Sequence, residues 1–513
     1  MAVPERQWSH SAGAPGSING EQQMSDTPNA SASRTMQELS TGLPDPLTIP
    51  DARRRIREAN ESGNRWVIVL DDDPTGSQTV HDTPVLTSWD ADDLKWAFDQ
   101  PGHGFFILTN SRGFNDDEAR EQVSEVARAV EREARKRGAE VALIARGDST
   151  LRGHYPLETD VLITQAATAG MPFSALLLAP AYFPAGRVTV GDVHYVGTGD
   201  TFVPVGLSNY AKDATFGFSA STLPDYIEEK TGGAIAATDV ISIGLEDIRK
   251  GGPERVRDIL LGCTDAQPVA VNLLEEADLD VVVLGLLLAE EQGARVLTRC
   301  GPSFPGARLG IAARDPLTHD EIFAGGERPG HGLVVVGSHV ELTTRQVAHL
   351  HAEVTDIETV VVDVPRLLDP AGSGPELARV GEALISALGR TDVVLASSRE
   401  QITGDSGHSS LVIAQTVSAV LVALTEIAVS DATPAWVIAK GGITSSDVAT
   451  GGLKIRRAMV AGQLFPGIVS VWLHVGEDNP ALSGLPYVVF AGNVGADDTL
   501  AEAVKILRGD ART

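Results

Sequence analysis

The sequence WVIVLDDDPTGSQT occupies residues 66–79, and its two halves differ sharply in character. Residues 66–70 are all apolar, residues 71–73 are consecutive aspartates, and Pro-Thr-Gly follows at 74–76. A short apolar run that stops at a polar loop is typical of a buried strand in a parallel sheet. The stretch therefore predicts a strand that delivers polar side chains to its carboxyl end.

The same arrangement recurs in the first half of the chain. Apolar runs at 105–108, 141–144 and 175–179 each end at polar residues or at proline. Helical patterns cover residues 51–62 and 118–137. Strands that alternate with helices predict an α/β fold with a mainly parallel sheet. Polar residues that follow successive strands then lie at the carboxyl edge of the sheet, where ligands bind in open α/β folds.

A second alternating series follows a Gly- and Pro-rich break at residues 325–330. It predicts strands at 333–336, 359–363, 392–396, 435–439, 467–473 and 486–490, and helices at 343–353, 376–389, 409–428 and 444–461. We therefore predict two α/β domains, each a mainly parallel sheet flanked by helices, with the active site in the cleft between them. The predicted domains cover residues 48–325 and 331–513. Residues 1–47, rich in Ser, Gly, Pro, Ala and Asn, are predicted to form a disordered tail.

The bulk composition limits the classes of partner. A chain of 513 residues is too long for one ordinary core and favours two domains. Its formal net charge of −28 argues against nucleic acid or an anionic membrane as the main partner. No apolar run reaches the length of a membrane span, and the N-terminus lacks the features of a secretory signal. Cys263 and Cys300 show no metal-ligand spacing and fit reduced thiols, so a cytoplasmic location is expected.

Three adjacent carboxylates at residues 71–73 repel one another, so folding them together requires a nearby cation, backbone amide or metal ion. Asp72 or Asp73 could accept a proton from a substrate hydroxyl, and Thr75 adds a hydroxyl beside them. The carboxylates could also hold substrate hydroxyls or a magnesium ion. The alternative is that these residues only cap the next helix.

A second motif, residues 146–154, places two arginines, an aspartate and two hydroxyls within a few positions. Arginine binds a carboxylate bidentately, and aspartate and hydroxyl groups suit a polyol. A shorter version follows another predicted strand at residues 109–113. The candidate substrate ligands of these two loops are Ser111, Arg112, Asp148, Ser149 and Arg152. The alternative is a pair of solvated turns in which aspartate and arginine only neutralise each other.

A third motif, residues 440–447, follows a predicted strand and opens a predicted helix. Its two glycines let the backbone approach a ligand, and free N–H groups with the helix dipole favour phosphate. Short Gly-rich turns are common, so the motif alone indicates phosphate binding only weakly. Residues 337–339 and 491–495, which also follow strands, would join it in a nucleotide site.

Several well-defined catalytic motifs are absent from the sequence. It contains no GxxxxGK[ST] loop, no HExxH, no GxSxG and no complete GxGxxG. A P-loop nucleoside triphosphatase, a zinc protease of the HExxH type and an α/β-hydrolase are therefore disfavoured.

Taken together, these motifs resemble those of the four-carbon acid sugar kinase family. The family's DDxTG, SR and DSTxRG loops and its GS and GG-x-T motifs match residues 72–76, 111–112, 148–153, 337–338 and 441–444. The stretch 458–472 and the turn at 491–493 also fit the pattern, so the resemblance spans roughly residues 64–505.

The chain departs from the family pattern at two places. The later acidic position of DDxTGAxD is missing, because residues 75–79 have the sequence TGSQT. The lysine of the late KSGNFG turn is missing, because residues 490–495 have the sequence FAGNVG. These departures indicate a divergent branch that shares the reaction type and leave the substrate open.

The resemblance implies an ATP-dependent kinase with a sugar-acid-binding N-terminal domain and a nucleotide-binding C-terminal domain. It would phosphorylate a hydroxyl of an acid such as threonate, erythronate or 3-oxo-tetronate, with Mg²⁺ bridging the phosphates. Asp72 or Asp73 would accept the proton, and Arg112 and Arg152 would hold the substrate carboxylate. The implied ATP contacts are Ser338, Ser397, Gly441, Gly442, Ile443, Thr444 and Gly492.

Two other functions stay open at this point. A two-domain protein could sense a sugar acid or a nucleotide without turnover, which the two departures allow. A phosphate-ester hydrolase could use the aspartate cluster and would release phosphate without ADP. The oligomeric state is also open, with a homodimer as one option.

Overall fold

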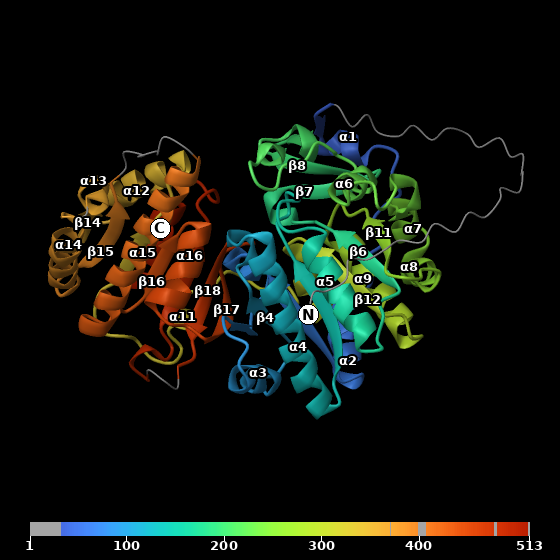
Figure 1. Cartoon of the computed structure of the whole chain (residues 1–513), viewed down its shortest axis with the longest axis horizontal. Helices are drawn as coiled ribbons and strands as arrows, with labels where there is room; N and C mark the ends of the chain where they lie inside the picture. The colour runs from blue at the N-terminus through green and yellow to red at the C-terminus, as the bar shows by residue number, and fades with distance from the viewer. Residues whose placement is uncertain (1–31, 370, 399–406, 477–479, 511–513) are drawn as a thin grey trace, which may run out of the picture. The chain divides into compact units, whose positions relative to one another are not determined.

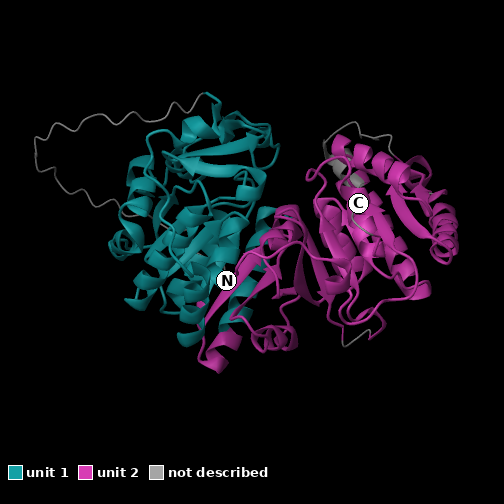
Figure 2. Cartoon of the chain, turned by 180° about the vertical axis from the view of Figure 1, so that it is seen from behind, with its two compact units in different colours: residues 1–63, 114–131, 142–310 teal, residues 64–113, 132–141, 311–513 magenta. Residues whose placement is uncertain are grey.

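The computed structural model describes residues 32–369, 371–398, 407–476 and 480–510. Internal contacts divide the chain into two compact units, which have different colours in Figure 2. Unit 1 consists of residues 1–63, 114–131 and 142–310, and unit 2 of residues 64–113, 132–141 and 311–513. Each unit therefore combines segments that are far apart in the sequence.

The main sheet of unit 1 is parallel and has the strand order β10-β11-β6-β12-β5. Its strands are β10 (Ile241–Ile243), β11 (Gln267–Val271), β6 (Ala175–Ala179), β12 (Val296–Cys300) and β5 (Glu140–Arg146). Every residue of β6 and β12 is buried, as expected for strands covered by helices on both faces. The strands predicted at 141–144 and 175–179 are confirmed.

Unit 1 also contains a four-stranded antiparallel sheet of order β1-β9-β8-β7. Its strands are β1 (Arg34–Thr35), β9 (Thr201–Pro204), β8 (Val193–Thr198) and β7 (Arg187–Val190). The predicted disordered tail is wrong for residues 32–47. β1 pairs with β9, and a capping box between Thr35 and Glu38 starts helix α1 (Met36–Ser40). Residues 1–31 of the predicted tail lie outside the described residues.

The sheet of unit 2 has the strand order β2-β4-β3-β17-β18-β19-β16-β13-β15-β14. Its strands are β2 (Arg65–Asp71), β4 (Gly104–Leu108), β3 (Thr83–Leu86), β17 (Arg457–Phe465), β18 (Val469–His474), β19 (Pro486–Phe490), β16 (Val437–Lys440), β13 (Leu333–Val336), β15 (Asp392–Ser397) and β14 (Ile357–Val362). Strands β2, β4 and β3 are parallel, and so are β19, β16, β13, β15 and β14. Only the pairings made by β17 and β18 are antiparallel, so the sheet is mainly parallel, as predicted.

Helices lie on the faces of these sheets (Figure 1). In unit 1 they are α2 (Ala52–Ser62), α5 (Leu157–Thr168), α6 (Leu223–Lys230), α7 (Leu245–Arg249), α8 (Gly252–Leu261), α9 (Glu276–Glu291) and α10 (Ser303–Leu309). In unit 2 they are α3 (Ala91–Phe98), α11 (His319–Ile322), α12 (Glu341–Glu353), α13 (Val364–Leu368), α14 (Ser373–Leu388), α15 (Gly407–Asp431), α16 (Gly442–Asp447) and α17 (Thr499–Arg508). The unit boundary at residue 131 falls within α4 (Asp116–Arg137). In the described part of the chain, no helix has the length and apolar character needed to cross a membrane.

The helix predicted over residues 444–461 is wrong in its second half. α16 ends at Asp447, residues 448–452 form a π-helical turn, and β17 begins at Arg457. Gly451 and Gly452 weaken a helix at this point because glycine loses the most backbone freedom when it is ordered. Along β17, half-buried and buried positions alternate, which is the period of a strand rather than of a helix.

This topology gathers the predicted loops of unit 2. The parallel strands β13, β15, β16 and β19 end at the same edge of the sheet, so the residues that follow them are neighbours. β2 and β4 are likewise parallel, and their ends meet where the backbone N–H of Thr109 donates to the Asp71 carbonyl at 2.8 Å. Beneath the first edge lies an apolar core that includes the fully buried Val336, Ile438 and Phe490.

Candidate functional site

Asp71 and Asp72 lie at the end of strand β2, and both are buried. The Asp71 carbonyl accepts hydrogen bonds from the backbone N–H of Thr109 at 2.8 Å and from its hydroxyl at 3.0 Å. The Asp71 carboxylate lies directly against Gly76, where a Cβ atom would collide with it. The glycine of the DDxTG loop is therefore explained by close packing against the first aspartate of the cluster.

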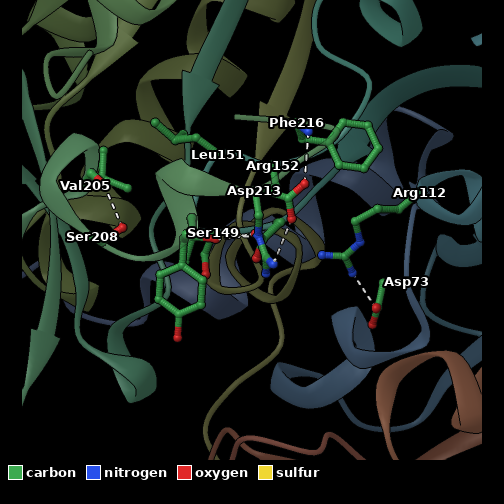
Figure 3. A network of polar contacts seen from close by, with 12 residues as sticks. Asp73, Arg112, Ser149, Leu151, Arg152, Val205, Ser208, Asp213 and Phe216 are labelled. Carbon is green, nitrogen blue, oxygen red and sulfur yellow. Dashed lines mark hydrogen bonds and ion pairs between the residues drawn. The ribbon is translucent and has the colours of Figure 1, made fainter. Parts of the chain in front are cut away.

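Asp73 starts the 3₁₀-helix η1 (Pro74–Thr79) and caps it. Its Oδ1 accepts the backbone N–H of Thr75 at 2.8 Å and the Thr75 hydroxyl at 2.5 Å. Its Oδ2 forms an ion pair with the guanidinium of Arg112 (Figure 3). Asp73 therefore caps η1 with one carboxylate oxygen and pairs with Arg112 through the other. Its predicted catalytic role remains a prediction.

Arg112 supplies positive charge to the aspartate cluster. It belongs to the short helix η2 (Ser111–Gly113), and its Nη2 atom lies 3.9 Å from Asp72 Oδ1 in addition to its contact with Asp73. The neighbouring Ser111 is completely buried, and its hydroxyl lies 3.3 Å from the Thr109 hydroxyl. The positive guanidinium thus offsets the repulsion between the adjacent carboxylates. Its predicted role as a substrate ligand remains a prediction.

Gly442, the first residue of α16, lies next to Asp73. A Cβ atom on Gly442 would be 3.2 Å from Asp73 Oδ2, so this oxygen faces the first turn of the helix. The first N–H groups of a helix have no partner within it. A carboxylate and a set of backbone donors therefore lie side by side in unit 2, although they are far apart in the sequence.

The predicted phosphate-binding loops converge around this helix. The backbone N–H groups of Gly337 and Ser338 both lie 3.3 Å from the Lys440 carbonyl and donate to it. Gly441 has a φ of +135°, and a Cβ atom on it would lie 2.8 Å from Thr444 Oγ1. A Cβ atom on Gly337 would collide with the same hydroxyl. Both glycines are therefore needed for the close approach of the two loops.

The loop after β19 completes this group. A Cβ atom on Gly492 would come within 2.5 Å of Ser338 Oγ, which places Gly492 against the first loop. From α12, the Thr343 hydroxyl donates to the Gly492 carbonyl at 3.0 Å and lies 3.1 Å from Ser338 Oγ. The Gln346 amide donates to two further carbonyls of the same loop at 3.0 and 2.8 Å. Helix α12 therefore fixes the backbone of Gly492.

The two remaining predicted ATP contacts lie at the margins of these loops. Ser397 is buried at the end of β15, and its hydroxyl lies 3.3 Å from Nε2 of His339, the residue after Ser338. Ile443 is 70% exposed on the first turn of α16. An apolar side chain in this position offers a surface on which a flat ligand could pack.

The sequence analysis assigned no role to Lys440, although its motif began there. The side chain is 0% exposed, and its Nζ atom donates a 2.7 Å hydrogen bond to the Ala491 carbonyl. Burial lowers the pKa of this lysine to about 7. The sequence signal that could have singled out Lys440 was a lysine at the end of an otherwise apolar strand. Lysine is almost never fully buried, so a lysine in such a strand is unusual.

In unit 1, the loop after β5 gathers the predicted substrate ligands. Arg152 donates from Nε to Asp148 Oδ2 at 2.7 Å and to Thr150 Oγ1 at 3.2 Å. The Thr150 hydroxyl also hydrogen-bonds to Asp148. Ser149 is buried, with 5% of its surface exposed. Asp148 and Arg152 therefore form an ion pair with each other. Their predicted role as substrate ligands remains a prediction.

A second carboxylate faces Arg152. Figure 3 shows Asp213 with the backbone N–H of Phe216, which donates to it at 3.0 Å, and Arg152 Nη1 lies 3.6 Å from Asp213 Oδ2. Burial is the largest influence on the pKa of Asp213 and would raise it. The N–H groups of Phe216 and Thr215, together with Arg152, nevertheless hold it below its usual value. The guanidinium also lies 5.1 Å from the ring centre of Tyr210. A substrate carboxylate on Arg152 would therefore share the guanidinium with Asp213 or displace it.

His194 is a second residue that the sequence analysis missed. It is completely buried, its Nε2 lies 2.7 Å from the Ser149 carbonyl, and its Nδ1 lies 2.9 Å from the Thr189 hydroxyl. Burial lowers its pKa to about 4, so the ring is neutral at pH 7. Nε2 then donates to the Ser149 carbonyl and Nδ1 accepts from Thr189, which fixes the backbone of the loop after β5.

Comparison with known proteins assigns both halves of the chain. The family described as "Sugar-binding N-terminal domain" matches residues 67–308, and the family described as "Nucleotide-binding C-terminal domain" matches residues 333–500. The chain belongs to the four-carbon acid sugar kinase family. In this family member, the aspartate cluster and the Arg152 loop fall within the sugar-binding match, and the loops around α16 fall within the nucleotide-binding match.

Two solved structures share the fold over most of the chain. A Salmonella typhimurium LT2 protein named as a candidate tRNA synthase is 19% identical, has a TM-score of 0.60, and is covered over 98% of its length by 86% of this chain. A Haemophilus influenzae protein assigned to the family DUF1537 is 15% identical, has a TM-score of 0.57, and is covered over 100% of its length by 86% of this chain. At these identities the likeness shows the fold alone. No curated protein matches the chain.

Proposed function

We propose that this chain is an ATP-dependent kinase that phosphorylates a hydroxyl of a short sugar acid, such as threonate, erythronate or 3-oxo-tetronate. The position of Asp73 is the observation that carries the proposal. Its Oδ2 atom lies against Gly442 at the first turn of α16, where the loops of the nucleotide-binding domain converge. Phosphoryl transfer depends mainly on position and charge neutralisation, and this arrangement offers both backbone donors and a carboxylate.

The roles of the residues follow from the chemistry of each group. The N–H groups of the first turn of α16, with the close-packed backbone at Gly441 and Gly492, would hold ATP phosphates. Asp72 or Asp73 would accept the proton of the attacking hydroxyl as the γ-phosphoryl group moves to it. Arg112, paired with Asp73, would keep the carboxylates in place and add positive charge beside the transferred group.

The sugar acid would bind to the loop after β5. Arg152 would bind the substrate carboxylate. Asp148 would accept hydrogen bonds from the substrate hydroxyls, and the Ser149 hydroxyl would donate to them. His194 holds the Ser149 backbone from beneath at 2.7 Å and so gives this loop a fixed shape.

Magnesium is the cofactor that a kinase of this kind requires. The described residues contain no group of three or more His, Cys, Asp or Glu side chains arranged for a metal ion. Mg²⁺ usually keeps several waters and binds one or two carboxylates together with substrate phosphates. Asp72 and Asp73, whose carboxylates both lie near Arg112, would hold it. When bound, the ion would neutralise charge on the ATP phosphates.

A coupled ADP-release screen tests the proposal directly. The full-length protein is offered ATP and Mg²⁺ with a panel of four- to six-carbon aldonic and oxo acids. We expect ADP release that depends on one class of acid, with stoichiometric phosphorylated product detected by mass spectrometry. Ligand-dependent thermal stabilisation without any ADP release would instead support the non-catalytic binding protein. Release of phosphate from a phosphorylated acid without ADP would support the hydrolase.

A further inference from the structure

Lys440 combines complete burial with a position among all the nucleotide-binding loops. Its main-chain carbonyl accepts from the N–H groups of Gly337 and Ser338 at 3.3 Å, and Gly441 follows it directly. Its Nζ atom donates to the Ala491 carbonyl at 2.7 Å. One residue therefore touches the backbone on each of the three loops proposed to hold ATP.

The surroundings of the Nζ atom are apolar. The Nζ atom lies 3.7 Å from the centre of the Phe490 ring. In the sheet, residue Lys440 pairs with Phe490 on one neighbouring strand and with Val336 on the other. Within the described ranges, no carboxylate forms an ion pair with it. A buried ammonium normally requires such a pair, because transfer of a charge out of water is unfavourable.

The ionisable groups on the surrounding elements have partners of their own. Arg345 of α12 contacts Asp497 at 2.9 Å and Glu341 at 3.3 Å, all at exposed positions. Asp447 of α16 accepts from Ser418. His339 lies 3.3 Å from the Ser397 hydroxyl. The lowered pKa of Lys440, about 7, accordingly arises from burial.

We propose that Lys440 is a proton-coupled positioning residue, and that ATP binding to the adjacent loops is coupled to protonation of its Nζ atom. This inference rests on the proposed nucleotide function. The step adds a solvent proton to the amine lone pair and breaks no other bond. The charges of the ATP phosphates favour the ammonium form, which then holds the Ala491 carbonyl more strongly and aligns Gly492.

The consequence is a characteristic pH dependence of ATP affinity. In the free protein, the lysine is about half protonated at pH 7 and about one-tenth protonated at pH 8, given its lowered pKa. Binding should therefore take up about 0.1 proton at pH 6, about 0.5 at pH 7 and about 0.9 at pH 8. The affinity should fall by up to about tenfold for each pH unit above 7.

Isothermal titration calorimetry on the full-length chain tests this. ATP with excess Mg²⁺ is titrated at pH 6, 7 and 8 in pairs of buffers that differ in ionisation enthalpy, which gives the number of protons taken up. Lys440→Met keeps the length and burial of the side chain and removes the titrating group. Lys454→Met is the matched control, because Lys454 lies in the same unit with a side chain that is 68% exposed.

We expect proton uptake that rises from pH 6 to pH 8 in the wild-type protein and in Lys454→Met, and none in Lys440→Met. If Lys440→Met does not fold, the test is the pH dependence of proton uptake by the wild-type protein, which should have its midpoint near pH 7. ATP binding with equal uptake in wild type and Lys440→Met, or with no rise between pH 6 and 8, overturns this inference and leaves the kinase proposal standing. Absence of ATP binding by the wild-type protein at every pH overturns the proposed nucleotide function itself.

Discussion

Asp73 divides its two carboxylate oxygens between two tasks. Oδ1 holds the Thr75 backbone and hydroxyl, and Oδ2 lies between Arg112 and Gly442. Capping is worth about 1 kcal/mol, whereas a catalytic base contributes roughly 10²–10⁴-fold in rate. A change that preserves the cap and removes the charge therefore separates the two roles.

Asp73→Asn is expected to give a folded protein that binds ATP but whose kcat falls by roughly 10²–10⁴-fold, if Asp73 is the base. Asp72→Asn is measured beside it, because either residue could fill this role. Asp363→Asn is the matched control, since Asp363 caps α13 with an arginine beside it and lies at no proposed site. Near-normal kcat in both Asp72→Asn and Asp73→Asn would contradict the acid–base assignment and move the search to Asp148.

His194, which holds the loop after β5, makes the free energy of unfolding depend on pH. Its pKa is about 4 in the folded protein and about 6.5 in an unfolded chain. Below pH 6.5 the unfolded chain binds a proton that the folded chain refuses, so stability falls as the pH falls and levels off near pH 4. The loss amounts to about 2 kcal/mol by pH 5.

His194→Gln should remove this component, because glutamine can donate to the Ser149 carbonyl and does not titrate. The free energy of unfolding is measured by urea denaturation at pH 7 and at pH 5 for both proteins. We expect the wild-type protein to lose more stability than the variant between these pH values. Equal losses would mean that the buried ring is protonated in the folded protein as readily as in the unfolded chain.

Among the elements, α16 is the one whose first turn carries the proposed chemistry. Gly442 has no positive φ, so alanine would be tolerated by its backbone, but the added Cβ atom would lie 3.2 Å from Asp73 Oδ2. Such a contact is tighter than usual, and the carboxylate would have to move by a few tenths of an ångström.

Gly442→Ala is therefore expected to lower kcat by roughly tenfold to a hundredfold with little change in melting temperature. Gly374→Ala tests the same substitution in the first turn of α14, where a Cβ atom would meet nothing within 4 Å. We expect that control to keep wild-type turnover. Equal kcat in the two variants would show that the Asp73–Gly442 contact plays no part in the reaction.

Burial on both faces made several strands predictable, although the buried strands β11 and β12 of unit 1 were missed. Strands covered on both faces, such as β2, β6 and β13, form apolar runs that the sequence displays directly. β17 and the short antiparallel strands β7 to β9 escaped notice, because they are half-buried or lie between turns. In β17 the residues Arg457, Ala458 and Met459 also suit a helix, and its pairing with β3 and β18 makes it a strand.

The candidate site was predictable loop by loop, but its internal contacts were not. The DDxTG, SR and GG-x-T motifs could be found because each follows an apolar run. The contact of Asp73 with Gly442 joins residues from opposite ends of the chain, and no local pattern encodes it. The same holds for Lys440, whose burial depends on Phe490 in a neighbouring strand.

For the whole molecule, the composition of unit 2 limits how the chain can be divided. Strand β3 pairs with β17 through four residue pairs from Arg457–Leu86 to Val460–Thr83. The buried Asp93 also accepts hydrogen bonds from Arg456 and Arg457. A fragment of residues 331–513 retains the predicted nucleotide-binding loops and lacks all of these partners.

That fragment is expected to associate through the exposed edge of β17, because unpaired edge strands with apolar side chains template intermolecular pairing. Size-exclusion chromatography with light scattering should show oligomers of the fragment. At the same protein concentration, the melting temperature of the fragment should be lower than that of the full chain. Met459→Lys, at a half-buried position of β17, should reduce the association of the fragment, since charge on an edge strand blocks it. A monomeric fragment as stable as the full-length protein would show that β3 contributes nothing to β17.

The β3–β17 pairing can form only late in synthesis of the chain. The ribosome completes residues 83–86 long before residues 457–460, so β3 spends most of translation without the neighbour it has in the finished protein. Contacts between segments so distant in sequence form slowly, because a large loop must close first. Partly made chains of this size expose strand edges and apolar surface, which chaperones bind. Nascent chains arrested before residue 457 should therefore be held by chaperones more strongly than chains released after β17 has emerged.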